Sequence, residues 1–407
     1  MRSASRAVVA FIAAGLLAQS ALARDARRDP VSGRMRILYY GDAFAPSPYP
    51  AYVADPLTSV VALTGMTGTV SEVDRKMRVF MPRTYQDLLD KYDFIIISDA
   101  IVENFRADYI HWLSDSVIKG GVGLIMIGGH YSFGSRFGES PWGETVLQDA
   151  LPAICPTEGW APGSTAGRME IVAPNNVFIR SLPFNEIGPY GVFYYCNIVI
   201  PKEGSELIAN FHRMDQLYPL LVYQEIGEGA SVAMTTDWTP EGGRDFIRWP
   251  YYADYALNIA SYATGNKIPQ DVELAHRVRA LLNDYRSQVD TIHSVMDFVA
   301  SFGVNLDRAE KMLIEVDDTA KSGKNAYIEA DLQAALSSLE DAVDEVGSAC
   351  DFVWKLRYQA LIWIYLIEWF VVAATGMICG FILWTIMVKR RLYRETEVTR
   401  LMHAREA

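Results

Sequence analysis

His130 and Ser132, two residues apart in the stretch KGGVGLIMIGGHYSFGS (119–135), are the side chains whose types and spacing could do chemistry. A serine hydroxyl beside an imidazole can act as a nucleophile with its general base, provided that a carboxylate orients the ring. Asp99 and Asp237 both follow apolar runs and could supply that carboxylate. The sequence therefore allows a hydrolase or amidase at this point.

A structural role explains the same residues and is the interpretation that we favour. In this alternative Ser132 belongs to a tight turn and His130 is a loop histidine bonded to the backbone. Gly128, Gly129 and His130 would then form the rim of a binding site, joined by Arg244. The loop around Arg244 either holds an anion with its amides or is an ordinary capped helix start.

The elements around this stretch predict where it lies in a fold. An apolar strand at 93–98 and a helix at 105–118 are followed by a glycine pair, a fully apolar strand at 123–127 and a second glycine pair. Alternating strands and helices are typical of a parallel α/β sheet. Ligands and catalytic groups gather in such sheets beyond the carboxyl ends of the strands, so residues 128–132 are expected at that edge.

The flanking sequence extends this domain in both directions. We expect a first strand at 35–40, a helix at 56–63, a short strand near 69–73 and a helix at 84–91. Strand-like runs follow at 169–172, 192–200, 206–211, 220–225 and 230–235, and a last helix at 246–263. The prediction is one α/β domain over residues 34–266, with a mostly parallel sheet flanked by helices, as in flavodoxin-like folds.

Three stretches of this domain resemble a known family. YDFIIISDA (92–100), GGVGLIMIGGHYSFG (120–134) and TTDWTPEGGRDFIRWPYY (235–252) are similar to a membrane-associated group within the class I glutamine amidotransferase-like superfamily. The resemblance implies the α/β fold. Catalytic members carry a cysteine at a G-x-C-x-G elbow, a histidine later in the chain, and backbone amides as an oxyanion hole.

The catalytic residues of that superfamily have no counterpart in this sequence. The matching turn, 127–130, contains no cysteine, and the late segment 236–238 contains no histidine. Cys155 and Cys196 lie outside any elbow, and their spacing leaves open whether they form a disulfide. We therefore expect a domain that does not use thiol chemistry and favours binding over catalysis.

The two ends of the chain suggest a membrane protein. Two arginines, an apolar run at 7–17 and the Ala-Leu-Ala motif at 21–23 predict a signal peptide over residues 1–23, with an uncleaved anchor as the alternative. Residues 360–388 form an apolar run with one charge, Glu368. This run is long enough for a transmembrane helix, and the basic residues at 389–391 predict a cytoplasmic tail over 389–407. The prediction is therefore a single-pass, type I protein of the plasma or inner membrane, with its domain outside the cytoplasm.

Residues 267–358 change to a helical pattern. Apolar residues recur at spacings of three and four over 270–302, 306–320 and from about 325, with an expected stop at 322–323. The pattern predicts a coiled-coil-like stalk of two or three helices. A solvated structural stalk and a partner-binding coiled coil are both compatible with it. Glu368 fits either the outer membrane interface, beside aromatic residues, or a contact with a partner subunit.

Composition narrows the partners. The formal net charge of −12 argues against a nucleic-acid partner. No pair of cysteines has metal-ligand spacing, and no phosphate or dinucleotide motif occurs, so we expect no metal and no cofactor. Three functions stay open: a non-catalytic binding or assembly domain at the cell surface, a hydrolase using His130 and Ser132, and a subunit of a larger membrane complex.

Overall fold

A computed structural model describes residues 26–44, 46–64, 70–136, 138, 141–157, 159–161 and 166–403. The predicted signal peptide lies outside these residues. The chain divides into two compact units. The first holds residues up to Asn283 together with Lys321–Leu339, and the second holds Asp284–Ala320 with the chain from Glu340 onward.

A nine-stranded sheet is the centre of the first unit, counted over the described residues. In spatial order its strands are β2 (Thr58–Thr64), β1 (Met35–Gly41), β3 (Phe94–Ser98), β4 (Gly123–Ile127), β13 (Gly229–Met234), β12 (Gln216–Ile226), β11 (Glu206–Arg213), β7 (Gly167–Ile171) and β8 (Val192–Phe193). Strands β2 to β13 pair in parallel, and antiparallel pairs extend the sheet from β13 to β8. The prediction of a mostly parallel α/β core is confirmed for this central part.

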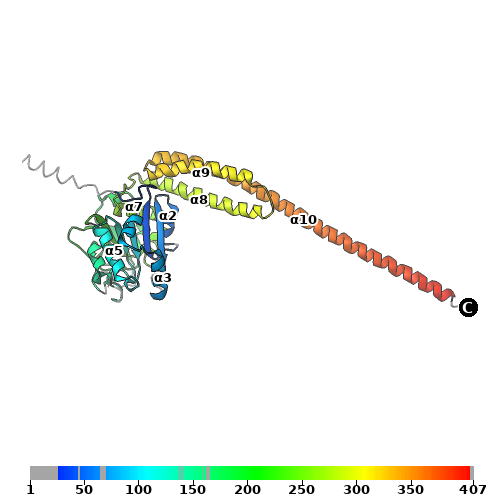
Figure 1. Cartoon of the computed structure of the whole chain (residues 1–407), viewed down its shortest axis with the longest axis horizontal. Coiled ribbons are helices and arrows are strands. Elements are labelled where there is room, and N and C mark those ends of the chain that lie inside the picture. The colour runs from blue at the N-terminus through cyan, green and yellow to red at the C-terminus, as the bar shows by residue number, and fades with distance from the viewer. Residues whose placement is uncertain are drawn as a thin grey trace, which may run out of the picture. The chain divides into compact units, whose positions relative to one another are not determined.

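Helices cover both faces of the sheet, as Figure 1 shows for α2, α3, α5 and α7. On one face α2 (Tyr49–Ala54), α6 (Val177–Arg180) and α7 (Tyr252–Ala263) pack against alternate residues of the strands. On the other face lie α3 (Val70–Phe80), α4 (Tyr85–Lys91) and α5 (Ala107–Ile118). Strands β3 and β4 are buried along their whole length, which explains their uninterrupted apolar sequence.

Short elements complete the first unit. They are the strands β5 (Ala153–Ile154), β6 (Trp160–Ala161), β9 (Cys196–Asn197) and β10 (Ile200–Pro201), and the 3-10 turns η1 (Val102–Asn104), η2 (Trp142–Glu144), η3 (Val146–Ala150), η4 (Phe184–Glu186), η5 (Gly188–Tyr190) and η6 (Phe246–Arg248). The pairs β10–β5 and β6–β9 form two small sheets of their own.

Several predicted elements are wrong. Residues 58–64 form strand β2, where a helix was expected, and the expected strand near 69–73 is instead the start of helix α3 from Val70. The run 192–200 is split among β8, β9 and β10. The last helix begins at Tyr252 rather than at 246, because Pro250 separates it from the 3-10 turn η6.

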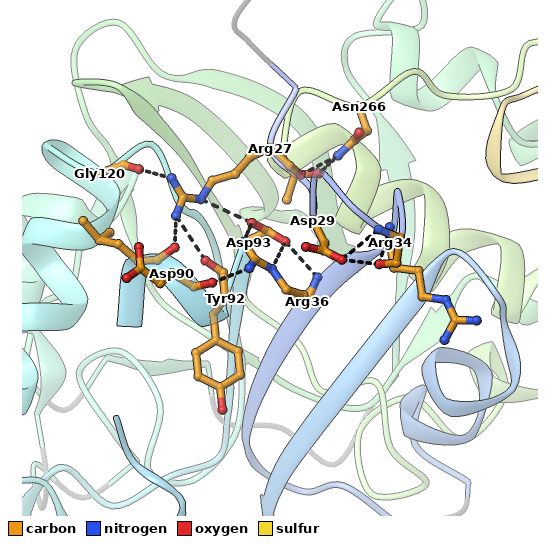
Figure 2. Close-up of polar contacts among 12 residues, drawn as sticks. Arg27, Asp29, Arg34, Arg36, Asp90, Tyr92, Asp93, Gly120 and Asn266 are labelled. Atoms are coloured by element: carbon orange, nitrogen blue, oxygen red, sulfur yellow. Dashed lines mark hydrogen bonds and ion pairs between the residues drawn. The ribbon is translucent and has the colours of Figure 1, made fainter. Parts of the chain in front are cut away.

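The residues just after position 25 bind to the amino-terminal edge of the sheet, where its parallel strands begin (Figure 2). The Arg27 guanidinium donates to the carbonyls of Gly120 at 2.6 Å and Leu89 at 2.5 Å, and its Nε lies 3.5 Å from the buried Asp93 carboxylate. Arg36 pairs with the same carboxylate through two nitrogens, at 2.9 and 2.8 Å. The first described residues are therefore part of the folded domain.

Three long helices follow the sheet domain: α8 (Val272–Ala300), α9 (Asp307–Ile328) and α10 (Leu332–His403). Within the second unit they share an apolar core that includes Ile292, Val316 and Val346. The expected stop at 322–323 is wrong, since α9 continues to Ile328. Gly323 faces Leu339, where an added Cβ would lie 2.8 Å from the leucine Cγ, so this glycine allows helix packing rather than ending a helix.

Helix α10 contains the apolar run. Among the described residues it is the one helix long and apolar enough to cross a membrane, judged by length and composition alone. It continues without a break from the bundle into this run. The predicted domain boundaries at 266, 358 and 388 stay predictions.

Candidate functional site

The turn after β4 lies at the carboxyl edge of the sheet, where it was predicted. Gly128 donates its amide to the Met234 carbonyl at 2.7 Å, which holds the turn against the end of β13. A Cβ on Gly128 would collide with the Thr235 carbonyl, and a Cβ on Gly129 with the Asp99 carboxylate. The two glycines are therefore required by close packing at this edge, which accounts for them without a ligand.

Asn197, on β9, holds this turn from the other side. Its side-chain oxygen accepts from the Gly129 amide at 3.0 Å, and its nitrogen donates to the carbonyls of Gly129 at 3.1 Å and Ser132 at 3.2 Å. Asn197 is fully buried. This contact could not be predicted from the sequence, because Asn197 is 68 residues away from Gly129 along the chain.

The candidate triad residues lie in one region without forming a triad. Ser132 is fully buried, and its hydroxyl accepts from the Asp99 amide at 3.3 Å. His130 places Nε2 3.0 Å from an Arg136 guanidinium nitrogen. Since a guanidinium can only donate, Nε2 must accept, so the ring proton lies on Nδ1. Among the described residues, no hydrogen bond joins His130 to Ser132, Asp99 or Asp237.

Two backbone amides of the turn are also occupied. The Tyr131 amide donates to the Asp99 carboxylate at 2.7 Å, and the Gly129 amide donates to Asn197. An oxyanion hole needs amides that point at a reacting oxygen. Here two of the amides that follow β4 already bind side chains of the protein.

Carboxylates gather at the same edge, with Asp237 buried and Asp42 and Asp99 half-buried. Asp42 follows β1, Asp99 follows β3 and Asp237 follows β13, and Glu241 lies close enough to influence them. Strands β2 and β3 lie on opposite sides of β1, so the chain reverses its direction of winding between β1 and β3. Such a reversal point is where open α/β sheets bind ligands.

Burial raises the pKa of the three aspartates at this edge. The pKa of Asp42 rises to about 7, first through burial and then through repulsion by Asp99, Asp237 and Glu241. The pKa of Asp99 rises to about 6, opposed by its bond from the Tyr131 amide. The pKa of Asp237 also rises to about 6, opposed by bonds from Thr239 and the Gly242 amide. The edge therefore exchanges protons near neutral pH.

Three aromatic rings lie beside these carboxylates, those of His130, Trp160 and Tyr195, and we call them the aromatic wall. Trp160 and Tyr195 stack with ring centroids 4.5 Å apart, and His130 lies 5.3 Å from Trp160. Arg136 lies over the Trp160 ring at 5.3 Å. Burial, and after it repulsion from Asp237 and Asp99, raises the pKa of the Tyr195 hydroxyl well above its usual value, so this ring connects the wall to the acidic group.

Arg244, the remaining predicted rim residue, is exposed and stacks on another ring. Its guanidinium lies 4.8 Å from the centre of the Tyr194 ring, and the Tyr194 hydroxyl donates to Asp245 at 3.0 Å. Asp42 and Asn197 were not among the predicted site residues. Asp42 could have been found, since it follows the first predicted strand as Asp99 follows the third.

The cysteines do not supply a nucleophile in this structure. Cys155 and Cys196 are free, and they belong to the apolar cores on opposite faces of the sheet. Burial raises the pKa of both thiols to about 12, which keeps them protonated at neutral pH. No group of three or more metal-binding side chains occurs within the described part of the chain.

Residues 74–264, which include β3, β4, β13 and the glycine turn after β4, match the family described as "GATase1_like: Putative glutamine amidotransferase". The chain thus carries a GATase1-like domain, and the resemblance read from its sequence is confirmed. No curated protein matches the chain.

Solved structures show a weaker likeness. The chain is similar to cytoplasmic protein STM3548 from Salmonella typhimurium, with 20% identity and a TM-score of 0.47, over 56% of this chain and 99% of that chain. It is also similar to cytoplasmic protein STM1381 from Salmonella typhimurium LT2, with 20% identity and a TM-score of 0.45, over 56% of this chain and 99% of that chain. A beta-galactosidase from Rahnella sp. R3 has 14% identity and a TM-score of 0.36, over 58% of this chain and 32% of that chain. No functional conclusion rests on these likenesses.

Proposed function

We propose that this chain is a single-pass membrane protein whose GATase1-like domain binds a ligand or partner outside the cytoplasm and performs no amide transfer. The observation that carries the proposal is the occupied turn after β4. Its serine is buried and bonded to the Asp99 amide, its histidine is bonded to Arg136, and two of its amides bind Asn197 and Asp99.

The binding surface in this proposal is the carboxyl edge of the sheet. Carboxylates that follow β1, β3 and β13 lie beside the aromatic wall of His130, Trp160 and Tyr195. Carboxylates accept hydrogen bonds and attract cations, while aromatic faces pack against apolar rings and cationic groups. A ligand with hydroxyl or amino groups and a flat apolar face fits both features.

The membrane part of the proposal rests on α10 and on the sequence at both ends. The apolar run of α10 supports a single span, and the basic residues at 389–391 support a cytoplasmic C-terminus. The Ala-Leu-Ala motif at 21–23 supports export of the domain. Contacts with partner proteins through the helices and Glu368 belong to the same proposal.

Hydrolysis assays on the purified full chain test whether the turn after β4 lacks catalytic activity. Wild type and Ser132→Ala are incubated with glutamine and with activated amide and ester substrates. The expected result is turnover at the buffer rate for both proteins. Turnover by wild type that Ser132→Ala abolishes would refute the proposal and establish the hydrolase alternative.

Binding and topology need separate measurements. A panel of sugars, amino sugars and polyamines is screened by calorimetry against wild type and Asp99→Asn, which keeps the size of the side chain. Binding that Asp99→Asn weakens supports the proposed edge, and binding that it leaves unchanged points elsewhere. Protease protection in sealed vesicles reports on which side of the membrane the domain lies.

A further inference from the structure

Exposed aromatic rings gather at one end of the three-helix bundle in the second unit. Phe298 and Phe302, in and just after α8, are 39% and 46% exposed, and their ring centroids lie 5.0 Å apart. Trp354 and Tyr358, one turn apart on α10, are 41% and 72% exposed. Large apolar side chains gathered at an exposed surface mark an interaction site.

Arg357 joins the rings of the two helices. Its guanidinium lies 5.7 Å from the centre of the Phe298 ring and 4.7 Å from the centre of the Trp354 ring. The end of α8 and this part of α10 are therefore side by side. We call Phe298, Phe302, Trp354, Arg357 and Tyr358 the aromatic tip.

The position of the aromatic tip on α10 relates it to the apolar run. Tyr358 lies two residues before that run, which covers residues 360–388. At about 1.5 Å per helical residue the run is about 44 Å long. That length matches a bilayer with its headgroup layers, about 40–45 Å. A helix that places the run across a bilayer therefore places Tyr358 at the outer headgroup surface, and Arg357 brings Phe298 to the same level.

We propose that the aromatic tip inserts its rings into the outer headgroup layer, so that the hairpin between α8 and α9 is a second, peripheral contact with the membrane. This inference rests on the proposed span in α10. Tryptophan and tyrosine rings partition into this layer, where their polar end stays near water. Phenylalanine rings enter the boundary between the headgroups and the acyl chains. The contact would restrict the tilt of the bundle relative to the membrane.

The attraction comes from the rings rather than from net charge. Arg308, Lys355 and Arg357 could bind lipid phosphates, but Asp297, Asp307 and Asp351 lie at the same end of the bundle. Coulombic attraction to anionic lipids is therefore largely cancelled. The contact should form on neutral lipids and persist at high salt, because screening acts on charges and not on apolar burial.

The test measures how deep single fluorescent labels lie in a bilayer. The full chain carries a polarity-sensitive dye at Ser301→Cys, beside the aromatic tip, or at Ser287→Cys, an exposed position on α8 about 21 Å further along the helix. Cys350→Ser and Cys379→Ala remove the two accessible native thiols, while the buried Cys155 and Cys196 stay in place. The bilayers are phosphatidylcholine vesicles with nitroxide lipids, quenching either in the headgroup or deep in the chains.

The expected result is quenching by the headgroup nitroxide at position 301 and none above background at 287. Quenching at 301 should fall to the level of 287 in the double variant Phe298→Ser/Phe302→Ser, and high salt should leave the wild-type signal unchanged. Equal signals at 301 and 287 would overturn the proposal. So would a signal that high salt removes, which would assign the contact to lipid charges.

A third label separates this proposal from the span itself. The dye on native Cys379, with Cys350→Ser, should be quenched by the deep nitroxide if α10 crosses the bilayer. Deep quenching at 379 without headgroup quenching at 301 would leave the anchor intact and refute the aromatic tip. No quenching at 379 would refute both. Quenching at 301 that decreases as the protein-to-lipid ratio rises would show that the rings contact protein instead of lipid.

Discussion

Replacing Arg279 by methionine should cost this protein several kilocalories per mole of folding free energy. The Arg279 side chain, 7% exposed, donates to the Tyr327 hydroxyl at 2.7 Å, to the Asp254 carboxylate at 2.7 Å and to the Asn258 side chain at 3.0 Å. Tyr327 in turn donates to the buried Asp55 carboxylate at 3.0 Å. These contacts connect α7, α8, α9 and the turn after α2 inside the first unit.

The magnitude follows from what the substitution leaves behind. Arg279→Met removes the guanidinium that Asp254 and Asp55 share, and both carboxylates stay about 95% buried. Removing one partner of a buried ion pair costs about 3–5 kcal/mol, because the other charge stays out of water. At about 2–4 °C per kcal/mol, the midpoint of thermal unfolding should fall by about 6–20 °C.

The assay is thermal and urea unfolding of the full chain in detergent, followed by circular dichroism. Arg75→Met, at an exposed position on α3 of the same unit, is the matched control and should change stability little. In the double variant Asp254→Asn/Arg279→Met the loss should be smaller than the sum of the two single losses. A loss below about 1 kcal/mol for Arg279→Met, the range of exposed pairs, would refute the reasoning.

The same network should make stability depend on pH through His276. Its Nδ1 lies 2.7 Å from Asp254, its ring faces Tyr251 at 4.4 Å, and the bond to Asp254 raises its pKa while Arg279 opposes this. A raised histidine pKa gives stability that is complete below its ordinary value of 6.5 and is lost as pH rises through the folded value. His276→Gln should abolish that loss, whereas the exposed His293→Gln should not.

Acidic pH acts on the two carboxylates of the network in opposite senses. The pKa of Asp254 is lowered by His276 and Arg279 against the effect of burial, so its contribution is present above the ordinary value and disappears as pH falls through the folded value. Burial raises the pKa of Asp55 despite Arg279 and Tyr327, so protonation of Asp55 is favoured in the folded state. The stabilisation of the helix packing by this network should therefore be greatest at pH values between the folded pKa of Asp254 and that of His276.

Three further predictions concern the edges of the sheet. Asn197→Ala should destabilise the domain by about 1–3 kcal/mol, because it leaves buried backbone groups of the turn unpaired; unchanged urea unfolding would contradict this. The raised pKa of Asp42, about 7, means that its ionisation costs stability as pH rises from about 4 to 7, so Asp42→Asn should stabilise the protein at pH 8 but not at pH 4. Thermal melts at the two pH values measure this, and equal shifts would contradict it. Arg27→Met should cost about 2 kcal/mol through lost charged hydrogen bonds, measured against the exposed Arg34→Met; equal melting of the two variants would contradict it.

The central strands and the turn after β4 could be predicted because their signal is local. Residues 93–98 and 123–127 are short apolar runs between polar or glycine breaks, and the structure places β3 and β4 there. Strands buried on both faces must be apolar throughout. Their pattern therefore contains both the kind of element and its bounds.

The region 56–73 failed because its structure depends on distant partners. Thr58–Thr64 pairs in parallel with Met35–Gly41 and becomes an edge strand, which its own sequence, TSVVALT, does not distinguish from a helix after a proline. The run 192–200 failed for a similar reason. Its three short strands pair with β7, β6 and β5, which lie in three different sheets.

The positions of the candidate site residues at the ends of strands could be predicted from the sequence, but their hydrogen bonds could not. Asp99, Asp237, His130 and Ser132 were found because each follows a strand that the sequence reveals. Their bonding was not predictable, because it depends on Asn197 and Arg136, whose approach is set by the loops between strands. Catalytic competence is a matter of which donors and acceptors remain unoccupied, and the spacing of residues in a sequence does not contain that information.

The turn after β4 combines the geometry of a catalytic elbow with the bonding of a structural one. Glycines at 128 and 129 allow close approach to β13 and to Asp99, which an exposed nucleophile would also need. The groups that would perform catalysis are used for internal bonds: the hydroxyl of Ser132 with the Asp99 backbone, and the Tyr131 amide with the Asp99 carboxylate. The same bonds fix Asp99 in a left-handed backbone conformation, with φ at 50°, at the end of β3. A residue held this firmly beside Asp42 and the aromatic wall suits a preformed binding surface, since an ordered site loses little conformational entropy when a ligand binds.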